Sequence, residues 1–170
     1  LKVIQKNYTA TKNIRIFMYL NHSTMIHREE PLENSIRILA SLVENYLSLG
    51  SCLEIYSNCE DCVTGQIFSV KKMQNAGYRE NFYKALARLD ITKLHTFEEN
   101  MEEKLFQDIN AATILVSPYG NADLQEKLRE YVWQNDSFYW VFPKRKDDTT
   151  VIHEALERHV LPVVLEGKEV

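Results

Sequence analysis

The residues whose types could support chemistry gather behind two apolar runs of this sequence. They are Asn21, His22, Ser23 and Thr24 after the run 14–20, and Ser117, Tyr119 and Asn121 after the run 112–116. A histidine beside a serine is the pairing of a general base with a nucleophile. However, no Gly-x-Ser-x-Gly turn surrounds Ser23, and no acid is marked to orient His22. A serine hydrolase is therefore not favoured.

A second candidate is the Cys59-Glu60-Asp61-Cys62 segment, which we expect in a polar loop between two strands. A redox Cys-x-x-Cys pair would open a helix, and a structural zinc would need two more ligands. Here a strand is expected to follow, and Cys52 is the only further cysteine. We therefore expect two loop thiols without a special role, with zinc bound through a distant histidine as the alternative.

Composition restricts the function classes. The 170 residues carry 20 Lys and Arg against 24 Asp and Glu, and the basic residues are scattered, which argues against nucleic-acid binding. No apolar run approaches the ~20 residues of a membrane span. We expect one soluble, cytoplasmic domain over residues 1–170, with 1–12 as a lead-in segment. Because the sequence opens at Leu1 without a methionine or a signal pattern, we also expect it to be a piece of a longer chain.

Alternating strand and helix patterns must position these candidates. Residues 14–20 form a continuous apolar run, typical of a strand covered on both faces. The stripe Leu32, Ile36, Leu39, Ala40, Val43 and Leu47 predicts a helix from Pro31 to Gly50. Further strands are expected at 52–57, 66–70, 112–117, 137–142 and 161–165, and further helices at 79–89, 97–109, from Asn121, and from Asp148 or Thr149.

This alternation predicts a doubly wound α/β domain with a mostly parallel sheet, helices on both faces, and one antiparallel edge strand from the short 52–57 to 66–70 connection. Ligands of such sheets bind at the carboxyl ends of the strands, where the strand order reverses. The loops at Asn21 and Ser117 are therefore where we expect function. A phosphoacceptor receiver domain is excluded because Asn21 and Ser57 stand where it needs acidic residues.

Three segments carry a resemblance to a known family: LKVIQKNYTATKNIRIFMYLN, the helix LENSIRILASLVENYLSLG, and RENFYKALARLD. Together they resemble the domain-of-unknown-function family 58, and the resemblance extends over nearly the whole chain. The resemblance implies a von Willebrand factor type A-like, Rossmann-like fold. It also implies a MoxR-type AAA+ ATPase as partner and a membrane anchor upstream of Leu1.

Type A domains often bind Mg²⁺ through an Asp-x-Ser-x-Ser loop, a Thr from a second loop and an Asp from a third. Mg²⁺ requires hard oxygen ligands, including carboxylates. The resemblance aligns Asn21, Ser23 and Glu80 with this set, but Asn21 replaces the Asp and the third loop has none. We expect a degenerate metal site and no cofactor, with Mg²⁺ as the alternative.

We therefore expect a non-enzymatic interaction domain, and the resemblance implies that its parent protein is membrane-anchored. The residues expected to contact the partner are His22, Thr24, Ser117, Tyr119 and Asn121. Tyr119 could instead pack over the end of the sheet. A metal-dependent ligand-binding module is the alternative function, and an enzyme with an unrecognised α/β site is the third.

Overall fold

The computed structural model describes residues 12–21 and 29–165. Within them the strands are β1 (Asn13–Met18), β2 (Cys52–Asp61), β3 (Ile67–Met73), β4 (Leu89–Leu94), β5 (Ala112–Val116), β6 (Phe138–Arg145) and β7 (Val160–Leu165). The helices are α1 (Glu29–Ser48), α2 (Arg79–Leu86), α3 (Phe97–Asn100), α4 (Glu102–Gln107) and α5 (Ala122–Gln134), with short 3₁₀ turns η2 (Ala76–Tyr78) and η3 (Glu154–His159). No helix in these ranges is long and apolar enough to cross a membrane.

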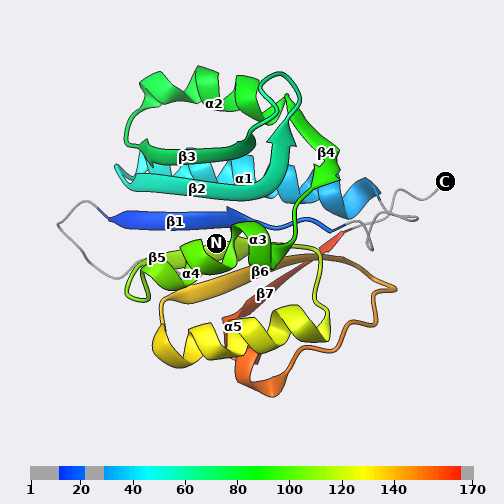
Figure 1. Cartoon of the computed structure of the whole chain (residues 1–170). Helices are drawn as coiled ribbons and strands as arrows, with labels where there is room; N and C mark the ends of the chain where they lie inside the picture. Colours follow the sequence, from blue (N-terminus) through cyan, green and yellow to red (C-terminus); the bar gives the residue numbers. More distant parts are fainter. Residues whose placement is uncertain (1–11, 22–28, 166–170) are drawn as a thin grey trace.

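The strands form one sheet in the order β3-β2-β1-β5-β6-β7, with β4 paired to β2 outside this path. The pairs β1–β2, β1–β5, β5–β6 and β6–β7 are parallel. The pair β2–β3 is antiparallel, and β4 also runs antiparallel to β2. The predicted mostly parallel, doubly wound α/β sheet is therefore confirmed (Figure 1).

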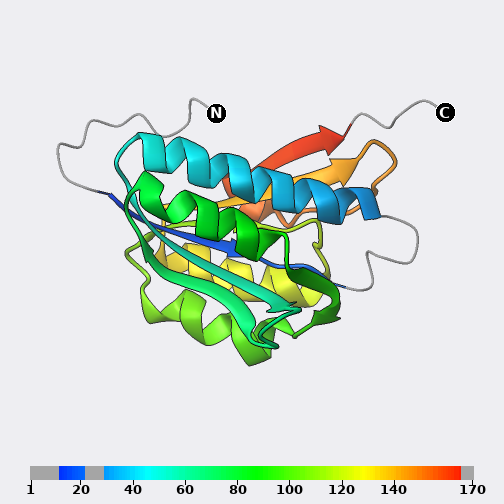
Figure 2. The ribbon, with the colours of Figure 1, turned by 90° about the horizontal axis from the view of Figure 1, so that it is seen from above.

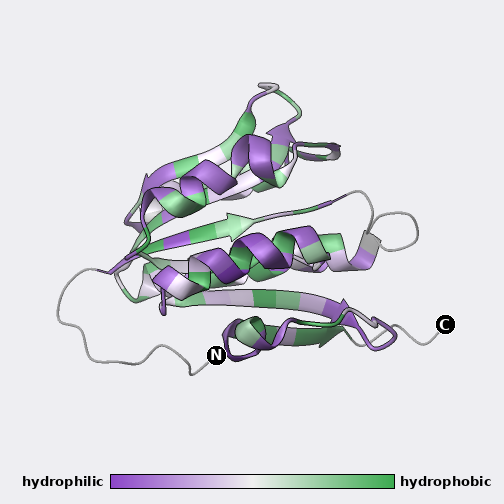
Figure 3. Cartoon of the chain, turned by 60° about the horizontal axis from the view of Figure 1, so that its bottom comes forward, coloured by the Kyte–Doolittle hydropathy of each residue, from purple (hydrophilic) through white to green (hydrophobic). Residues whose placement is uncertain are grey.

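Helices cover both faces of the sheet, with α1 and α2 on one side and α4 and α5 on the other (Figure 2). The strand β1 shows why its sequence is continuously apolar. Ile14, Ile16 and Met18 pack in the core beneath α1 and α2, while Phe17 and Tyr19 belong to the core beneath α3, α4 and α5. Successive side chains of a strand point to opposite faces, so both sets must be apolar. Figure 3 shows the strands largely hydrophobic and the helices with hydrophilic outer turns.

The clearest predicted helix is confirmed. Its stripe residues Leu32, Leu39 and Val43 are buried, and the chain turns at Gly50, whose φ of 75° lies in the left-handed region that glycine adopts readily. The predicted cap of α5 is also confirmed, because the side chain of Asn121 accepts a hydrogen bond from Leu124 N at 2.9 Å.

Several predicted boundaries are wrong for identifiable reasons. The helix expected over 79–89 ends at Leu86, and Leu89 opens β4 instead. The helix expected over 97–109 is broken at Met101 into α3 and α4. The strand expected over 52–57 continues to Asp61, because its second half pairs with β3 and β4. The β4 residues lie far from β2 in the sequence, so local patterns do not reveal this pairing.

The carboxyl-terminal elements differ as well. Pro143 does not close β6 but lies within it, paired with Val163 of the edge strand β7. The expected last helix is the 3₁₀ turn η3, and its cap is His153 rather than Asp148 or Thr149. Leu156 and His159 of this turn are buried. Of the expected lead-in segment, residues 1–11 lie outside the described residues.

Candidate functional site

The strand order reverses at β1, the first strand, which lies between β2 and β5. The chain passes from β1 to β2 through α1 on one face and from β4 to β5 through α3 and α4 on the other (Figure 2). The carboxyl ends of β1 and β5 therefore flank the position where doubly wound sheets bind ligands. We call this region, formed by Tyr19, Asn21 and residues 117–121, the carboxyl-edge site.

The described start of the first predicted loop, residues 19–21, lies beside the second loop, residues 117–121. Tyr19 N donates to Val116 O at 3.0 Å, which extends the β1–β5 pairing past the end of β1. The rings of Tyr19 and Tyr119 meet edge to face with their centroids 5.9 Å apart. The side-chain amide of Asn21 donates to the Tyr19 hydroxyl at 3.2 Å. The structure thus brings Asn21 and Tyr119 to one place through Tyr19.

Tyr19 is the buried centre of this arrangement. Only 4% of its surface is exposed, and its ring also packs against Phe97 with 5.4 Å between centroids. Burial raises the pKa of the Tyr19 phenol, although the hydrogen bond from Asn21 acts in the opposite direction. The phenol therefore stays neutral near pH 7, and Tyr19 supports Tyr119 as an uncharged aromatic wall.

The second loop is fixed by its own hydrogen bonds. The Ser117 hydroxyl accepts from Tyr119 N at 3.2 Å, and the Ser117 carbonyl accepts from Trp140 Nε1 at 3.0 Å. Ser117 is fully buried, and the side-chain oxygen of Asn121 is occupied as the cap of α5. Ser117 is thus inaccessible and the Asn121 oxygen is engaged. Of the three predicted contact residues in this loop, this leaves the half-buried ring of Tyr119 as the group best placed to contact a partner.

The remaining predicted residues of the first loop, His22, Ser23 and Thr24, lie outside the described residues. Glu80 lies elsewhere. It is in the first turn of α2, which follows the end of β3, and that end pairs with the start of β2 at Leu53. Glu80 is therefore at the amino edge of the parallel strands, exposed and paired with Lys84 at 2.7 Å. The structure does not bring Glu80 together with Asn21.

The loop that does reach the carboxyl edge beside Leu20 is His95–Thr96, which sequence reasoning missed. The side-chain nitrogen of Asn58 donates to both Leu20 O and His95 O, at 2.6 and 2.8 Å, and so joins the two loops. Thr96 forms a capping box with Glu99: its hydroxyl accepts from Glu99 N, and Glu99 accepts from Thr96 N at 3.0 Å. The Thr-x-x-Glu spacing in the sequence was the signal for this helix start.

Charged residues flank the aromatic centre. Glu98 lies close enough to Tyr19 to act on its phenol electrostatically, and Lys127 of α5 pairs with Glu98 at 3.3 Å and with Glu102 at 2.9 Å. The hydrogen bond to Glu102 is the main cause that raises the pKa of Lys127. These ion pairs tie α3 and α4 to α5 beside the site.

Only the end of the cysteine segment is a loop, because residues 59–61 belong to β2. Cys59 lies within β2, is fully buried, and burial raises its thiol pKa to about 12 despite the hydrogen bond with Ser57. Such a thiol has almost no thiolate near pH 7, and the thiolate is the reactive form. Cys62 is exposed in the following turn, and all three cysteines are free.

His153 and His159, near the carboxyl terminus, have separate structural roles. His153 caps η3 by accepting from Ala155 N at 3.1 Å, and His159 Nδ1 contacts Phe138 O at 2.8 Å in the core. Within residues 12–21 and 29–165 no three His, Cys, Asp or Glu side chains are grouped so that they could hold a metal ion.

No protein-family model and no curated protein sequence matches the chain. The arrangement therefore has to be interpreted from its own geometry. The carboxyl-edge site presents the partly exposed ring of Tyr119 on a hydrogen-bonded loop, an arrangement suited to contact with another molecule.

Proposed function

We propose that this chain is a non-enzymatic protein-interaction domain of the von Willebrand factor type A-like kind, with its contact surface at the carboxyl-edge site. The observation that carries the proposal is the pair of Tyr19 and Tyr119 at the point where the strand order reverses. Large aromatic side chains on rigid supports contribute much of the binding energy of interfaces, because they bury large areas and lose little side-chain entropy.

The hydrogen bonds of the carboxyl-edge site support the proposal that the domain binds its partner without a metal ion. The Ser117 hydroxyl is engaged by the backbone of Tyr119, the Asn121 oxygen by the start of α5, and the Asn21 amide by Tyr19. Glu80, the carboxylate that the family resemblance offered to a cation, is at the opposite edge of the sheet. A Mg²⁺ ion loses much hydration free energy on binding and needs anionic oxygen ligands in return.

The partner in this proposal is a MoxR-type AAA+ ATPase, and the parent protein is membrane-anchored, as the resemblance to the domain-of-unknown-function family 58 implies. Binding of this domain to a purified MoxR-type ATPase, measured by biolayer interferometry, tests both the partner and the surface. Tyr119→Ala should weaken binding about tenfold or more, the effect of losing a central aromatic contact.

Trp133→Ala is the matched control. Trp133 is 91% exposed at the far end of α5, and the following strand β6 starts at the amino edge, where Phe138 pairs with Thr113. It is thus an exposed aromatic residue away from the carboxyl edge, and its loss should leave binding unchanged. Equal effects of the two variants would reject the carboxyl edge as the contact surface, and absence of binding would reject the ATPase.

Thermal unfolding with EDTA and with Mg²⁺ separates this proposal from the metal-dependent module. At about 100 times its dissociation constant a bound ion adds about 2.7 kcal/mol of stability, which is a shift of several degrees in a domain of this size. We expect no shift. A shift that Ser23→Ala removes would replace the proposal with the metal-dependent module.

A further inference from the structure

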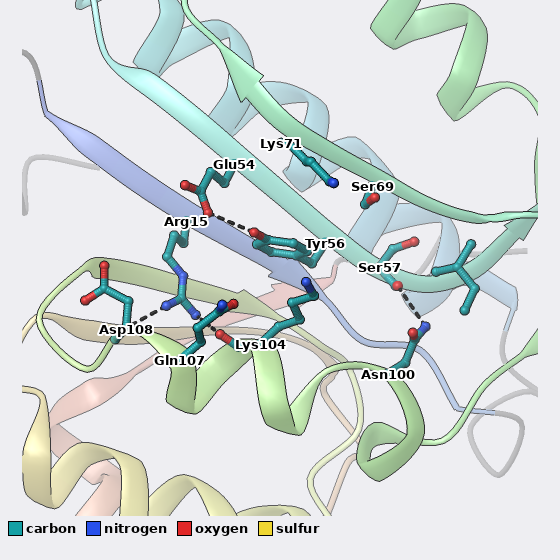
Figure 4. A pocket seen from close by; sticks show the side chains of 11 residues that line it. Arg15, Glu54, Tyr56, Ser57, Ser69, Lys71, Asn100, Lys104, Gln107 and Asp108 are labelled. Atoms are coloured by element: carbon teal, nitrogen blue, oxygen red, sulfur yellow. Dashed lines mark hydrogen bonds between the residues drawn. The ribbon is translucent and has the colours of Figure 1, made fainter.

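A groove of about 590 Å³ lies on the sheet face that α4 leaves uncovered (Figure 4). Tyr56 of β2 and Ser69 of β3 form its floor. Lys71 enters it from β3, and Lys104 and Gln107 enter it from α4. The groove runs along the outer strands beside β1 and is distinct from the carboxyl-edge site.

Two positive charges of the groove have no carboxylate partner among the described residues. The ammonium groups of Lys71 and Lys104 form no ion pair there, and Lys104 Nζ lies 5.8 Å above the ring of Tyr56. In Figure 4 the two lysines extend from opposite sides toward the space over this ring. An anionic group in this space would meet two ammonium groups.

The other charged residues of the groove are already engaged. Glu54 accepts the Tyr56 hydroxyl at 2.8 Å, and the Asp108 carboxylate accepts from the backbone of Asn110 and Ala111. The Arg15 guanidinium donates to the carbonyls of Lys104, Leu105 and Asp108 at the end of α4. These hydrogen bonds fix the side chains but leave their charges in place, so the groove carries three cations, Arg15, Lys71 and Lys104, against two carboxylates, Glu54 and Asp108. Its net charge is therefore +1, in a chain whose net charge is -4.

The shape of the groove selects the class of ligand. Small-molecule pockets are mostly apolar and enclose most of their ligand. This groove is lined mostly by polar and charged groups, including Ser69, Asn100 and Gln107, which can hydrogen-bond a peptide backbone. Carboxylates bound to ammonium groups form charge-assisted hydrogen bonds, which are stronger than neutral ones. We infer that the groove binds an extended acidic peptide segment of a partner protein, with its carboxylates between Lys71 and Lys104.

The experiment is a titration of the ¹⁵N-labelled domain with a hexaglutamate peptide, followed by NMR chemical shifts, with a hexaglutamine peptide as the neutral control. The amide signals of Ser69, Lys71 and Lys104 should shift with hexaglutamate and not with hexaglutamine. Lys71→Gln and Lys104→Gln should each weaken binding about threefold or more, and together about tenfold. Binding should also weaken strongly at about 1 M salt, where screening acts over about 3 Å.

Lys93→Gln is the matched control, because Lys93 is an exposed lysine of β4 outside the groove. Its loss should leave the affinity unchanged. Shifts scattered over the exposed lysines, or equal effects of Lys93→Gln and the two groove variants, would overturn the inference. So would a groove that responds to inorganic phosphate and not to hexaglutamate, since that result would assign a small oxyanion instead of a peptide.

Discussion

The side-chain amide of Asn58 binds both backbone groups of Leu20: its oxygen accepts from Leu20 N at 2.9 Å and its nitrogen donates to Leu20 O at 2.6 Å. This contact occurs where β2 continues beyond the end of β1, after the pairing of Met18 with Ser57. Asn58 thus replaces the strand partner that Leu20 would otherwise lack, and the same amide also holds His95 O. One fully buried side chain therefore joins the first loop of the carboxyl edge to the loop after β4.

Replacing this amide should lower stability substantially. Asn58→Asp keeps the shape but removes the donor to Leu20 O and His95 O, and it buries a carboxyl group beside two carbonyls. Each buried polar group left unsatisfied costs about 1–3 kcal/mol, so we expect a loss of about 2–4 kcal/mol in the free energy of unfolding. Urea denaturation measures it. Asn81→Ala, at an exposed position of α2, should change this free energy by about 0.5 kcal/mol or less. Equal stability of the two variants would contradict the role of Asn58.

Arg15 should stabilise the end of α4 about as strongly as Asn58 stabilises the carboxyl edge of the sheet. Its guanidinium, in a residue only 4% exposed, donates to three carbonyls at the end of this helix. Arg15→Met retains the apolar stem but leaves these carbonyls without their donor, and we expect a loss of about 3 kcal/mol. Hydrogen exchange should locate the loss in α4. The control Arg37→Met removes only an exposed ion pair with Glu33 on α1, worth about 0–1 kcal/mol. Unchanged protection in the Arg15 variant would refute the anchoring.

The three cysteines should differ sharply in reactivity. Cys62 is exposed, whereas Cys52 and Cys59 are buried and burial raises the pKa of Cys59 to about 12. A thiol reagent such as dithiobisnitrobenzoate should therefore modify one thiol in the native protein and three in denaturant, as read by absorbance or mass. Cys62→Ser should abolish the native reaction. Rapid modification of a second thiol in the native state would show that β2 opens readily.

Asp61 should make stability depend on pH in the acidic range. Desolvation acts to raise its pKa, but hydrogen bonds from the backbone of Val63 and Thr64 and the nearby Arg88 guanidinium, at 2.9 Å, hold the pKa below the usual value. A carboxyl group with a lowered folded-state pKa stabilises the fold above its unfolded-state pKa, and this contribution disappears as the pH falls through the folded-state value.

Asp61→Asn removes this dependence, so the variant should be less stable than the wild type near pH 7. The difference between them should shrink as the pH falls below about 4, where unfolded carboxyl groups take up protons. Unfolding free energies of both proteins across this range provide the comparison. A difference that stays constant down to the most acidic condition would show that the charge of Asp61 does not contribute.

The alternation of apolar patterns was enough to predict the class of the fold and that the chain segments at Asn21 and Ser117 lie at the same edge of the sheet. Strand β1 is buried on both faces, α1 buries the predicted stripe, and Asn121 caps α5, because each of these features depends on residues a few positions apart. The reversal of strand order between the loops at Asn21 and Ser117 followed from the same alternation, since crossovers on opposite faces leave few possible topologies.

The partners of single side chains required the tertiary structure. Glu80 was grouped with Asn21 from an alignment of patterns, but an antiparallel β3 carries the start of α2 to the opposite edge of the sheet. Cys59 was predicted in a loop because its strand character depends on the pairing of the second half of β2 with β3 and β4. For the same reason Leu89, the first residue of β4, was assigned to the preceding helix. The contacts of Asn58 with Leu20 and of Arg15 with Lys104 join residues 38 and 89 positions apart. The sequence by itself determined which segments become strands and helices in a doubly wound order, because local periodicity encodes burial. Only the tertiary structure decided which polar side chains meet, because those contacts depend on strand pairings between distant segments.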